Sequence, residues 1–463
     1  MKRIRAVRGA TIHFDPRGIG GVRFNELLQL LRVPNPDKAQ AERLGLFKAR
    51  FIKPYLNAWT LTQGGTRCDL PYGADSDPQV RAILSDLVDI EDDPDNLGRP
   101  LEGLGGAERV SLYNYQAQAL ARLLEARRGI VVAPCGSGKT RIGVALARAL
   151  GRSCLWLTHT EKLLKQSEGV WRSFFGDAGV GEITEGRVNV GRNITFATVQ
   201  TLSRIDRSWT EFGTVIVDEA HHCAGTPTKL RMFSKALERI NARYKFGLTA
   251  TPKRQDGLFK TAKWLLGGIA YTISPTELPG RLKPTYIRID TGITHPSHLW
   301  THPDGTIDFN AYQALIANDG LRNEAIARKV SDLSHTSRGQ LILCSRIVQA
   351  KDIYARIQRR IGEAESVALL IGETGRRTSL RGKEVIVATY AIAKEGLDVP
   401  ELDTLHYASP VKDEVAIVQS VGRISRTCEG KTSATVFDYV DADPYAESAA
   451  TKRRRIIHRE VTR

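Results

Sequence analysis

A glycine-rich run at residues 133–140 is the feature of this chain best suited to bind phosphate. It reads Ala-Pro-Cys-Gly-Ser-Gly-Lys-Thr, follows an apolar segment at 129–133 and precedes a helical pattern at 140–150. Glycines let backbone N–H groups approach phosphate oxygens, and the positive end of a helix adds attraction. We expect Lys139 to reach the β- and γ-phosphates of ATP and Thr140 to ligate Mg²⁺. The predicted ATP-binding residues of this run are Pro134, Cys135, Gly136, Ser137, Gly138, Lys139 and Thr140.

Two adjacent carboxylates, Asp218 and Glu219, follow a second apolar segment at 214–217. Acids that leave the carboxyl end of a buried parallel strand lie where α/β sheets bind ligands. We expect Asp218 to hold Mg²⁺ through water, and Glu219 to orient or deprotonate the water that attacks ATP. The His-His-Cys run at 221–223 could also suggest zinc. Adjacent residues rarely point at one metal, so the ATPase interpretation is favoured.

Short apolar segments alternate with helical patterns along most of the chain, which predicts parallel sheets covered by helices. One set is expected in residues 106–280 and a second in residues 326–463. The expected strands are residues 129–133, 153–158, 193–198, 214–217, 340–344, 366–371, 384–389 and 404–409. The predicted fold class is therefore α/β with two lobes of one architecture. Residues 281–325 are rich in Pro, Thr, His and Gly and are expected to connect the lobes.

Residues 1–105 differ from the rest of the chain in charge, and we expect a small α+β accessory domain there. Residues 1–53 hold 12 Lys and Arg against 4 Asp and Glu, whereas residues 86–95 are acidic and a glycine-rich run follows them. That acidic and glycine-rich end is expected to be a solvated linker. The whole chain has a formal net charge of +16. Such a charge modestly favours nucleic acid as a partner over a basic protein that binds no polyanion.

The six cysteines are widely scattered, and none forms a C-x-x-C pair. This spacing indicates reduced thiols rather than a disulfide framework or a zinc site. The first residues are basic but lack the apolar segment of a signal peptide, and no stretch approaches the length of an apolar membrane-spanning helix. We therefore expect a cytoplasmic protein without a membrane partner.

Four further motifs resemble those of helicase superfamily 2 and occur in that family's order. Asp218-Glu-Ala-His221 resembles the DEAH form of motif II, and Leu248-Thr-Ala-Thr-Pro252 resembles motif III. Ala388-Thr389 with Glu395-Gly-Leu-Asp398 resembles motif V, and Gln419 to Arg426 resembles motif VI with its paired arginines. The resemblance covers residues 112–426. It implies two RecA-like lobes that share an ATP site.

The resemblance also implies a role for each residue that falls on a motif. The second lobe would present Gln419, Arg423 and Arg426 to the γ-phosphate. Gln116 would read the adenine, while Gly396 and Asp398 would approach the ribose and the attacking water. The residues that couple the ATP state to nucleic-acid grip would be His221, Thr249 and Thr251. Those that contact nucleic-acid phosphates would be Thr158, His159, Thr198, Gln200, Arg254, Ser345, Arg346 and Thr389. For each of these the alternative is a plain strand-end hydrogen bond.

Within the superfamily the chain looks most like the XPB-type, RadD-type and phage recombination helicases. Arg254-Gln255-Asp256 is similar to the Arg-Glu-Asp element of XPB-type proteins, with a changed centre. This implies an ATP hydrolase that acts as a DNA helicase or translocase on single-stranded, forked or branched DNA. It would unwind or branch-migrate DNA in recombination, repair or replication, in a bacterium or phage-infected host, with residues 1–105 as its DNA-binding domain. The alternatives are an RNA helicase, a duplex translocase that works with a partner nuclease, and a non-catalytic nucleic-acid-binding scaffold.

Overall fold

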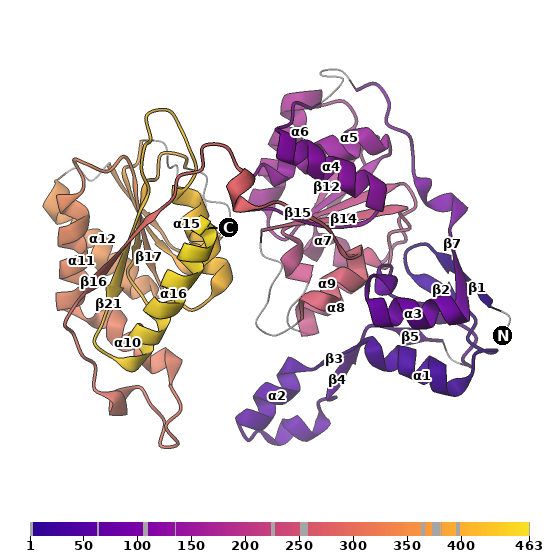
Figure 1. The fold of residues 1–463 in the computed structure, drawn as a ribbon, viewed down its shortest axis with the longest axis horizontal. Helices are drawn as coiled ribbons and strands as arrows, with labels where there is room; N and C mark the ends of the chain where they lie inside the picture. The colour runs from indigo at the N-terminus through magenta and orange to yellow at the C-terminus, as the bar shows by residue number, and fades with distance from the viewer. Residues whose placement is uncertain are drawn as a thin grey trace. The chain divides into compact units, whose positions relative to one another are not determined.

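The structure is a computed structural model (Figure 1). It describes residues 3–62, 64–104, 110–134, 136–223, 227–250, 258–362, 366–372, 380, 382–394 and 399–462. The chain divides into unit 1, Met1–Ile273, and unit 2, Ser274–Arg463. Among the described residues, no helix combines the length and the apolar character that crossing a membrane requires.

The main sheet of unit 1 has the strand order β11-β10-β12-β9-β13-β14-β8-β15. Its neighbours are parallel except for β11, which pairs antiparallel with β10. The strands are β8 (Gly129–Val132), β9 (Cys154–Thr158), β10 (Val180–Thr184), β11 (Arg187–Asn189), β12 (Ile194–Thr198), β13 (Thr214–Asp218), β14 (Tyr244–Thr249) and β15 (Ile269–Thr272). The four segments expected as strands in this lobe are observed as β8, β9, β12 and β13. Each of these four is buried along its whole length, as expected for parallel strands covered on both faces.

Helices cover both faces of this sheet. The helices are α4 (Asn114–Ala126), α5 (Lys139–Leu150), α6 (Glu161–Phe175), α7 (Val199–Arg204), α8 (Pro227–Leu237) and α9 (Phe259–Leu266). The first three pack together on one face and the last three on the other (Figure 1). Gly143 lets α5 approach the sheet closely, because a Cβ at that position would lie 2.5 Å from the Trp156 ring. This contact brings the start of α5, and with it Lys139, close to the sheet.

The N-terminal region, residues 3–104, adds a second sheet to unit 1, with the strand order β5-β6-β2-β1-β7. Its elements are β1 (Ile4–Arg8), β2 (Ile12–Phe14), α1 (Gly21–Leu30), β5 (Thr60–Leu61), β6 (Cys68–Leu70), α3 (Pro78–Leu87) and β7 (Val88–Asp92). The acidic residues expected in a solvated linker partly form β7, which is parallel to β1. Strand β7 is fixed by its pairing with β1 and by the buried Val88, and its exposed acids Asp89 and Glu91 contact Arg3 and Arg5.

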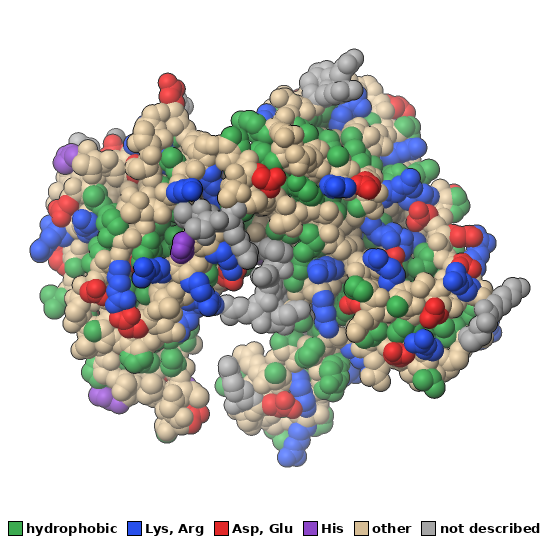
Figure 2. Space-filling view, viewed as in Figure 1, with side chains coloured by type: hydrophobic (Ala, Val, Ile, Leu, Met, Phe, Trp, Pro, Cys, Tyr) green, Lys and Arg blue, Asp and Glu red, His purple; other side chains and the backbone are tan. Residues whose placement is uncertain are grey.

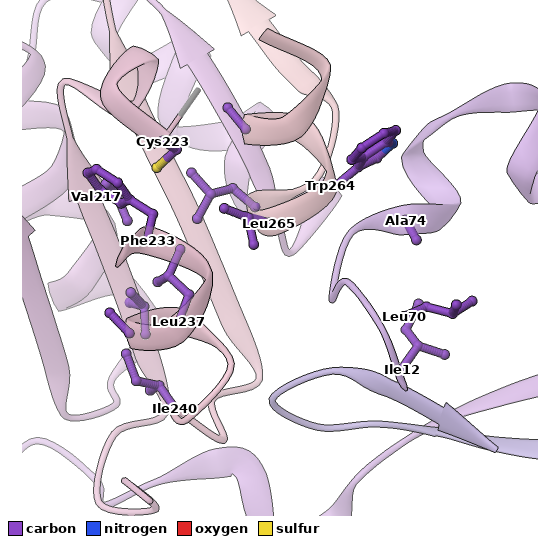
Figure 3. Packing of buried hydrophobic residues seen from close by; sticks show 14 of the residues in the cluster. Ile12, Leu70, Ala74, Val217, Cys223, Phe233, Leu237, Ile240, Trp264 and Leu265 are labelled. Carbon is purple, nitrogen blue, oxygen red and sulfur yellow. The ribbon is translucent and has the colours of Figure 1, made fainter. Parts of the chain in front are cut away.

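The N-terminal region and the main sheet of unit 1 share one hydrophobic core. In Figure 3, Trp264 and Leu265 of α9 lie between Ile12 and Leu70 of the N-terminal sheet and the apolar residues beside β13. Gly73 N donates to the carbonyl of Trp264 at 2.7 Å, and a Cβ at Gly73 would lie 2.4 Å from a backbone nitrogen of α9's end. The fully buried Lys245 donates to the carbonyl of Ala10, and burial lowers the pKa of this lysine to about 7.

Residues Arg32–Asn57 form a small module, which we call the β3–β4 module. It contains β3 (Arg32–Pro34), α2 (Pro36–Arg43), a 3-10 turn (Phe47–Phe51) and β4 (Tyr55–Asn57), and the two strands pair only with each other among the described residues. In Figure 1 it extends away from the rest of unit 1. Phe47, Phe51 and Tyr55 are exposed by 71%, 76% and 53% on this module.

Unit 2 is built on one parallel sheet with the strand order β16-β21-β20-β17-β19-β18. Its strands are β16 (Thr285–Asp290), β17 (Gln340–Cys344), β18 (Val367–Leu370), β19 (Val385–Thr389), β20 (Thr404–Tyr407) and β21 (Thr435–Val440). Its helices are α10 (Phe309–Asn318), α11 (Gly320–Asp332), α12 (Ile347–Ile361), α14 (Tyr390–Lys394), α15 (Glu414–Ile424) and α16 (Pro444–Thr462). The four strands predicted for this lobe are present.

Residues 281–325, expected as the connection between the lobes, are largely structured within unit 2. They contain β16, α10 and the start of α11. Strand β16 reads TYIRID and pairs along its whole length with β21. Its mixture of apolar and polar residues suits a strand at the edge of a sheet. The surrounding sequence is rich in Pro and Thr, so the strand was not recognised from the sequence.

Candidate functional site

Three strand ends bring the predicted catalytic segments of unit 1 together. In the main sheet β14 lies between β13, which ends at Asp218, and β8, which leads into the glycine loop (residues 133–140). Ala133 N donates to the carbonyl of Thr249 at 2.8 Å, so the loop and the end of β14 are directly joined. The carboxyl edge of this sheet is where ligands bind in α/β folds.

The glycine loop has the backbone conformation expected of a phosphate cradle. Gly136 and Gly138 adopt φ of 83° and 75°, values that favour glycine, and Gly138 is the N-cap of α5. The buried Ser137 hydroxyl has no hydrogen-bond partner among the described residues, and backbone N–H groups at a helix start attract anions. Cys135 lies outside the described residues. The loop therefore fits a phosphate group, which could satisfy the Ser137 hydroxyl.

Two side chains in the first turn of α4 hydrogen-bond to the glycine loop. Gln116 Nε2 donates to the Ser137 carbonyl at 2.8 Å, and the Tyr115 hydroxyl donates to the same carbonyl at 3.2 Å. Gln116 is 2% exposed, and its Oε1 accepts from Tyr113 N. In this structure Gln116 thus positions the loop, and its predicted contact with adenine stays a prediction. Tyr115 was not singled out as a site residue.

The two predicted catalytic carboxylates adjoin the loop lysine. Lys139 Nζ lies 3.8 Å from Glu219 Oε1, and the two side chains are 11% and 15% exposed. Asp218 accepts from Glu219 N at 2.9 Å and from the Ser167 hydroxyl at 3.4 Å. Ser167 comes from α6, and no motif in the sequence pointed to it. Thr140, the second residue of α5, follows Lys139 at the helix start.

Glu219 has a backbone conformation that its residue type disfavours. Its φ is 49°, in the left-handed region, which costs a non-glycine residue about 1–2 kcal/mol. Strain of this kind persists where the surrounding structure holds it, and such sites are often functional. Here it turns the chain immediately after β13.

Burial and charge separate the acid–base behaviour of the two carboxylates. Burial raises the pKa of the Asp218 carboxyl above its usual range, and the Glu219 charge adds to the shift. Burial acts on Glu219 in the same direction, but Lys139 and His221 outweigh it and lower the pKa of Glu219. Glu219 is therefore the carboxylate that stays ionised, and Asp218 is the one that a neighbouring cation would help to ionise.

His221 links the carboxylates to the end of β14. Its Nδ1 lies 3.2 Å from Glu219 Oε2 and 3.2 Å from the Thr249 hydroxyl. Thr251, the third residue predicted to couple ATP state to nucleic-acid grip, lies outside the described residues. His221 and Thr249 are thus brought together, while a role in coupling stays a prediction.

The nucleic-acid contacts predicted for unit 1 gather at the ends of β9 and β12. Thr158 and Thr198 are cross-strand partners, and Gln200 Nε2 donates to the His159 carbonyl at 2.8 Å. The Thr158 hydroxyl donates to the Thr160 carbonyl, and the Thr198 hydroxyl accepts from Thr201 N. These two hydroxyls already serve a turn and a helix cap. Arg254 lies outside the described residues, together with Gln255 and Asp256.

The residues predicted in unit 2 fall at two places in that unit. Ser345 directly follows β17, and Thr389 is the last residue of β19, which pairs with β17. Arg346 is the N-cap of α12. Gln419 and Arg423 lie one turn apart on α15, are 8% and 7% exposed, and Arg426 follows the end of that helix. Gly396 and Asp398 lie outside the described residues.

Comparison with known proteins finds helicases among the relatives of this chain. Residues 109–254 match the family model described as the res subunit of type III restriction enzymes. A putative ATP-dependent RNA helicase of Acanthamoeba polyphaga mimivirus is 28% identical over 335 residues, which cover 68% of this chain and 60% of that protein. A probable helicase of Escherichia phage T5 is 30% identical and covers 66% of each chain. The ATP-dependent DNA helicase uvsW of Enterobacteria phage T4 is 24% identical over 77% of this chain and 74% of its own length.

The chain belongs to helicase superfamily 2. This superfamily 2 chain spans 60% and 66% of the length of the first two relatives, from mimivirus and phage T5. Its fold resembles a fragment of a putative HsdR subunit of a type I restriction enzyme from Vibrio vulnificus, with a TM-score of 0.54 at 20% identity over 90% of this chain and 78% of that one. It also resembles Saccharomyces cerevisiae Dbp5 bound to RNA, with a TM-score of 0.55 at 14% identity over 75% of this chain and 88% of that one. These likenesses confirm the expected α/β fold of RecA-like lobes with parallel sheets.

Proposed function

We propose that this protein hydrolyses ATP to drive a helicase or translocase on DNA. The observation that carries the proposal is the cluster of Lys139, Asp218, Glu219 and Thr249 at the carboxyl edge of the unit 1 sheet, beside a loop shaped for phosphate. Relatives named as helicases align with 66% and 77% of this chain. Unwinding or branch migration of forked or branched DNA during recombination, repair or replication is the proposed task, and the cytoplasm is the proposed location.

The chain's own residues account for the steps of ATP hydrolysis. Backbone N–H groups of the glycine loop and the Lys139 ammonium would hold the phosphates. Mg²⁺, held by Thr140 and Asp218, would neutralise phosphate charge and favour the ionised form of Asp218. Glu219 stays ionised and would take the proton of the attacking water. Lys139 and His221 orient the Glu219 carboxylate at 3.8 and 3.2 Å.

Unit 2 is proposed to complete the hydrolysis. Arg423 and Arg426 would stabilise negative charge on the γ-phosphate in the transition state, with Gln419 beside them. The Gln419 Oε1 is buried without a hydrogen-bond partner among the described residues, so it can accept a bond from a water or a ribose hydroxyl. Gly396 and Asp398 are proposed to act nearby on the nucleotide.

A first experiment tests whether DNA stimulates the ATPase. We expect steady-state ATP hydrolysis to rise at least about tenfold on addition of single-stranded or forked DNA, and the stimulation to fall steeply with salt because binding releases counterions. A matched RNA series serves as the comparison. Stronger stimulation by RNA would establish the RNA helicase alternative, and hydrolysis indifferent to both polymers would contradict the proposal.

Restriction-enzyme likeness favours a second candidate, a duplex translocase that works with a nuclease partner. The matching family model and one similar structure both carry restriction-subunit names. Displacement of a triplex-forming strand without unwinding of the duplex would support this candidate. Unwinding of a forked substrate by the chain alone would support the first.

The N-terminal region is proposed to contact DNA through the β3–β4 module. On the face shown in Figure 2, Lys and Arg side chains are scattered among acidic ones rather than gathered in a single stripe, so charge alone does not single out a binding surface. The module instead combines exposed rings with cations, since Arg50 lies over the Phe47 ring and Lys48 and Lys53 are exposed. Exposed rings beside cations are typical of single-strand binding, where bases stack on aromatic side chains.

Replacing Phe47 and Phe51 together with Ala is expected to weaken binding of single-stranded DNA at least about thirtyfold, because each stacked base contributes about 1–3 kcal/mol and two rings are removed. Hydrolysis in the absence of DNA should not change. Fluorescence anisotropy with a labelled oligonucleotide measures the affinity. Val22→Ala is the matched control, since Val22 is an 85% exposed apolar residue of the same region. An affinity within twofold of the unsubstituted protein would remove the module from the binding surface.

A further inference from the structure

Unit 2 contains a buried cluster of metal-ligating side chains that ATP hydrolysis does not use. His295, Asp441 and Asp443 each offer one ligand atom, and these three atoms all lie within 4.8 Å of one another. His295 lies in the segment after β16, and the two aspartates follow β21, which pairs with β16. The adjacent parallel strands therefore carry the three residues to one place.

The imidazole of His295 is unusual within this cluster. Its side chain is 8% exposed, and neither ring nitrogen has a hydrogen-bond partner among the described residues. Leaving a buried polar group unsatisfied costs about 1–3 kcal/mol, and such groups usually have a partner. The nearest carboxylate outside the cluster is that of Asp319, whose Oδ2 lies 3.4 Å from His295 Nε2.

The two aspartates are held rigidly and keep room for one more bond. The single Nε–H of Arg322 is shared by both Asp441 oxygens, and the Thr291 hydroxyl donates to one of them. The single hydrogen of the Tyr312 hydroxyl is shared by both Asp443 oxygens, and Ala446 N donates to one of them. An ionised carboxylate has about four acceptor positions, so at least one remains on each. The hydrogen-bond partners fix the carboxylates in place, as outer-sphere groups do around bound metals.

The charges of the cluster also favour a cation. Arg322 neutralises Asp441, and both side chains are fully buried. The hydrogen bonds to Asp443 come from neutral donors, and Asp319 adds a further carboxylate. A buried carboxylate without a compensating charge is costly, which a divalent cation would relieve.

We propose that His295, Asp441 and Asp443 form a binding site for a first-row divalent cation of the zinc class. One imidazole nitrogen with two carboxylate oxygens suits zinc, cobalt or manganese better than magnesium, which prefers oxygen ligands and bound water. Ligand atoms about 2.1 Å from a tetrahedral ion lie roughly 3.4 Å apart, so the distances between the three ligand atoms, at most 4.8 Å here, would shorten by up to roughly 1.4 Å on binding. The ion would tie the segment after β16 to the start of α16.

Cobalt titration of the chelator-treated chain of 463 residues tests the proposal, in excess Mg²⁺ to occupy magnesium sites. We expect one Co²⁺ per chain with visible absorption, displaced by Zn²⁺, and a higher melting temperature with either metal. His295→Gln is expected to weaken Co²⁺ binding at least about tenfold, as is Asp443→Asn. His302→Gln is the control, since His302 is an exposed histidine in the same segment.

X-ray absorption on the unsubstituted protein keeps the test decisive if a variant does not fold. One nitrogen and two carboxylate oxygens at the bound ion would support the site. Sulfur ligands would indicate one of the free cysteines, and would overturn the assignment. Absence of saturable binding, or equal weakening by His302→Gln and His295→Gln, would also overturn the assignment.

Discussion

Glu219→Gln is expected to lower the rate of ATP hydrolysis by about 10²- to 10⁴-fold while ATP binding persists. The amide keeps the size and hydrogen-bonding capacity of the side chain but cannot take a proton, and general-base catalysis contributes about this factor. Lys139 and the glycine loop remain, so the affinity for nucleotide should change little. Single-turnover hydrolysis measures the first effect, and binding of a fluorescent ATP analogue measures the second.

The matched control is Glu185→Gln, which also removes a carboxylate from unit 1. Glu185 is 87% exposed, and among the described residues its one ion-pair partner is the exposed Arg204. Hydrolysis by this variant should be normal. If Glu219→Gln hydrolysed ATP as fast as the control variant, Glu219 would not be the base, and the proposed ATPase site would have to be reassigned.

Arg453→Met is expected to destabilise unit 2 by about 3–5 kcal/mol, because it leaves the buried Asp438 without its cation. The two side chains are fully buried, and Arg453 donates to both Asp438 oxygens, at 2.9 and 2.6 Å. Since a chain of two units need not unfold in one step, the local measurement is hydrogen exchange of β20 and β21. If these strands exchange by unfolding of unit 2, their protection factors should fall by roughly 10²- to 10⁴-fold.

Arg454→Met provides the control, because Arg454 is the next residue on α16 and is exposed. Its protection factors should match those of the unsubstituted protein. Exchange in unit 1 strands such as β13 should be unchanged in both variants. Equal protection in the Arg453 and Arg454 variants would show that the buried pair contributes little to the stability of unit 2.

The parts of the fold that could be predicted from sequence are those where one local signal is enough. Continuous apolar runs predicted β9, β12, β13, β17 and β19, because buried parallel strands need apolar side chains on both faces. Edge strand β16 and acidic strand β7 could not be recognised this way. Their residues are partly polar, and each pairs with a strand far away in the sequence, β16 with β21 and β7 with β1.

The candidate site divides in the same way. The glycine loop and Asp218-Glu219 could be recognised from the sequence, because their residue types and spacing alone indicate phosphate and metal binding. Contacts made between distant segments do not, such as Ser167 to Asp218 or His221 to Thr249. The left-handed backbone of Glu219 also had no signal, because glutamate is not a residue type that favours positive φ.

The close junction between the N-terminal region and α9 has a mechanical consequence. At Gly73 the two backbones approach so closely that a methyl group would not fit, and a buried lysine crosses the same boundary. A tightly packed interface is hardly compressible, so a displacement of one side is transmitted to the other. If the N-terminal region binds DNA as proposed, the bound strand would therefore move together with the nucleotide-binding sheet of unit 1.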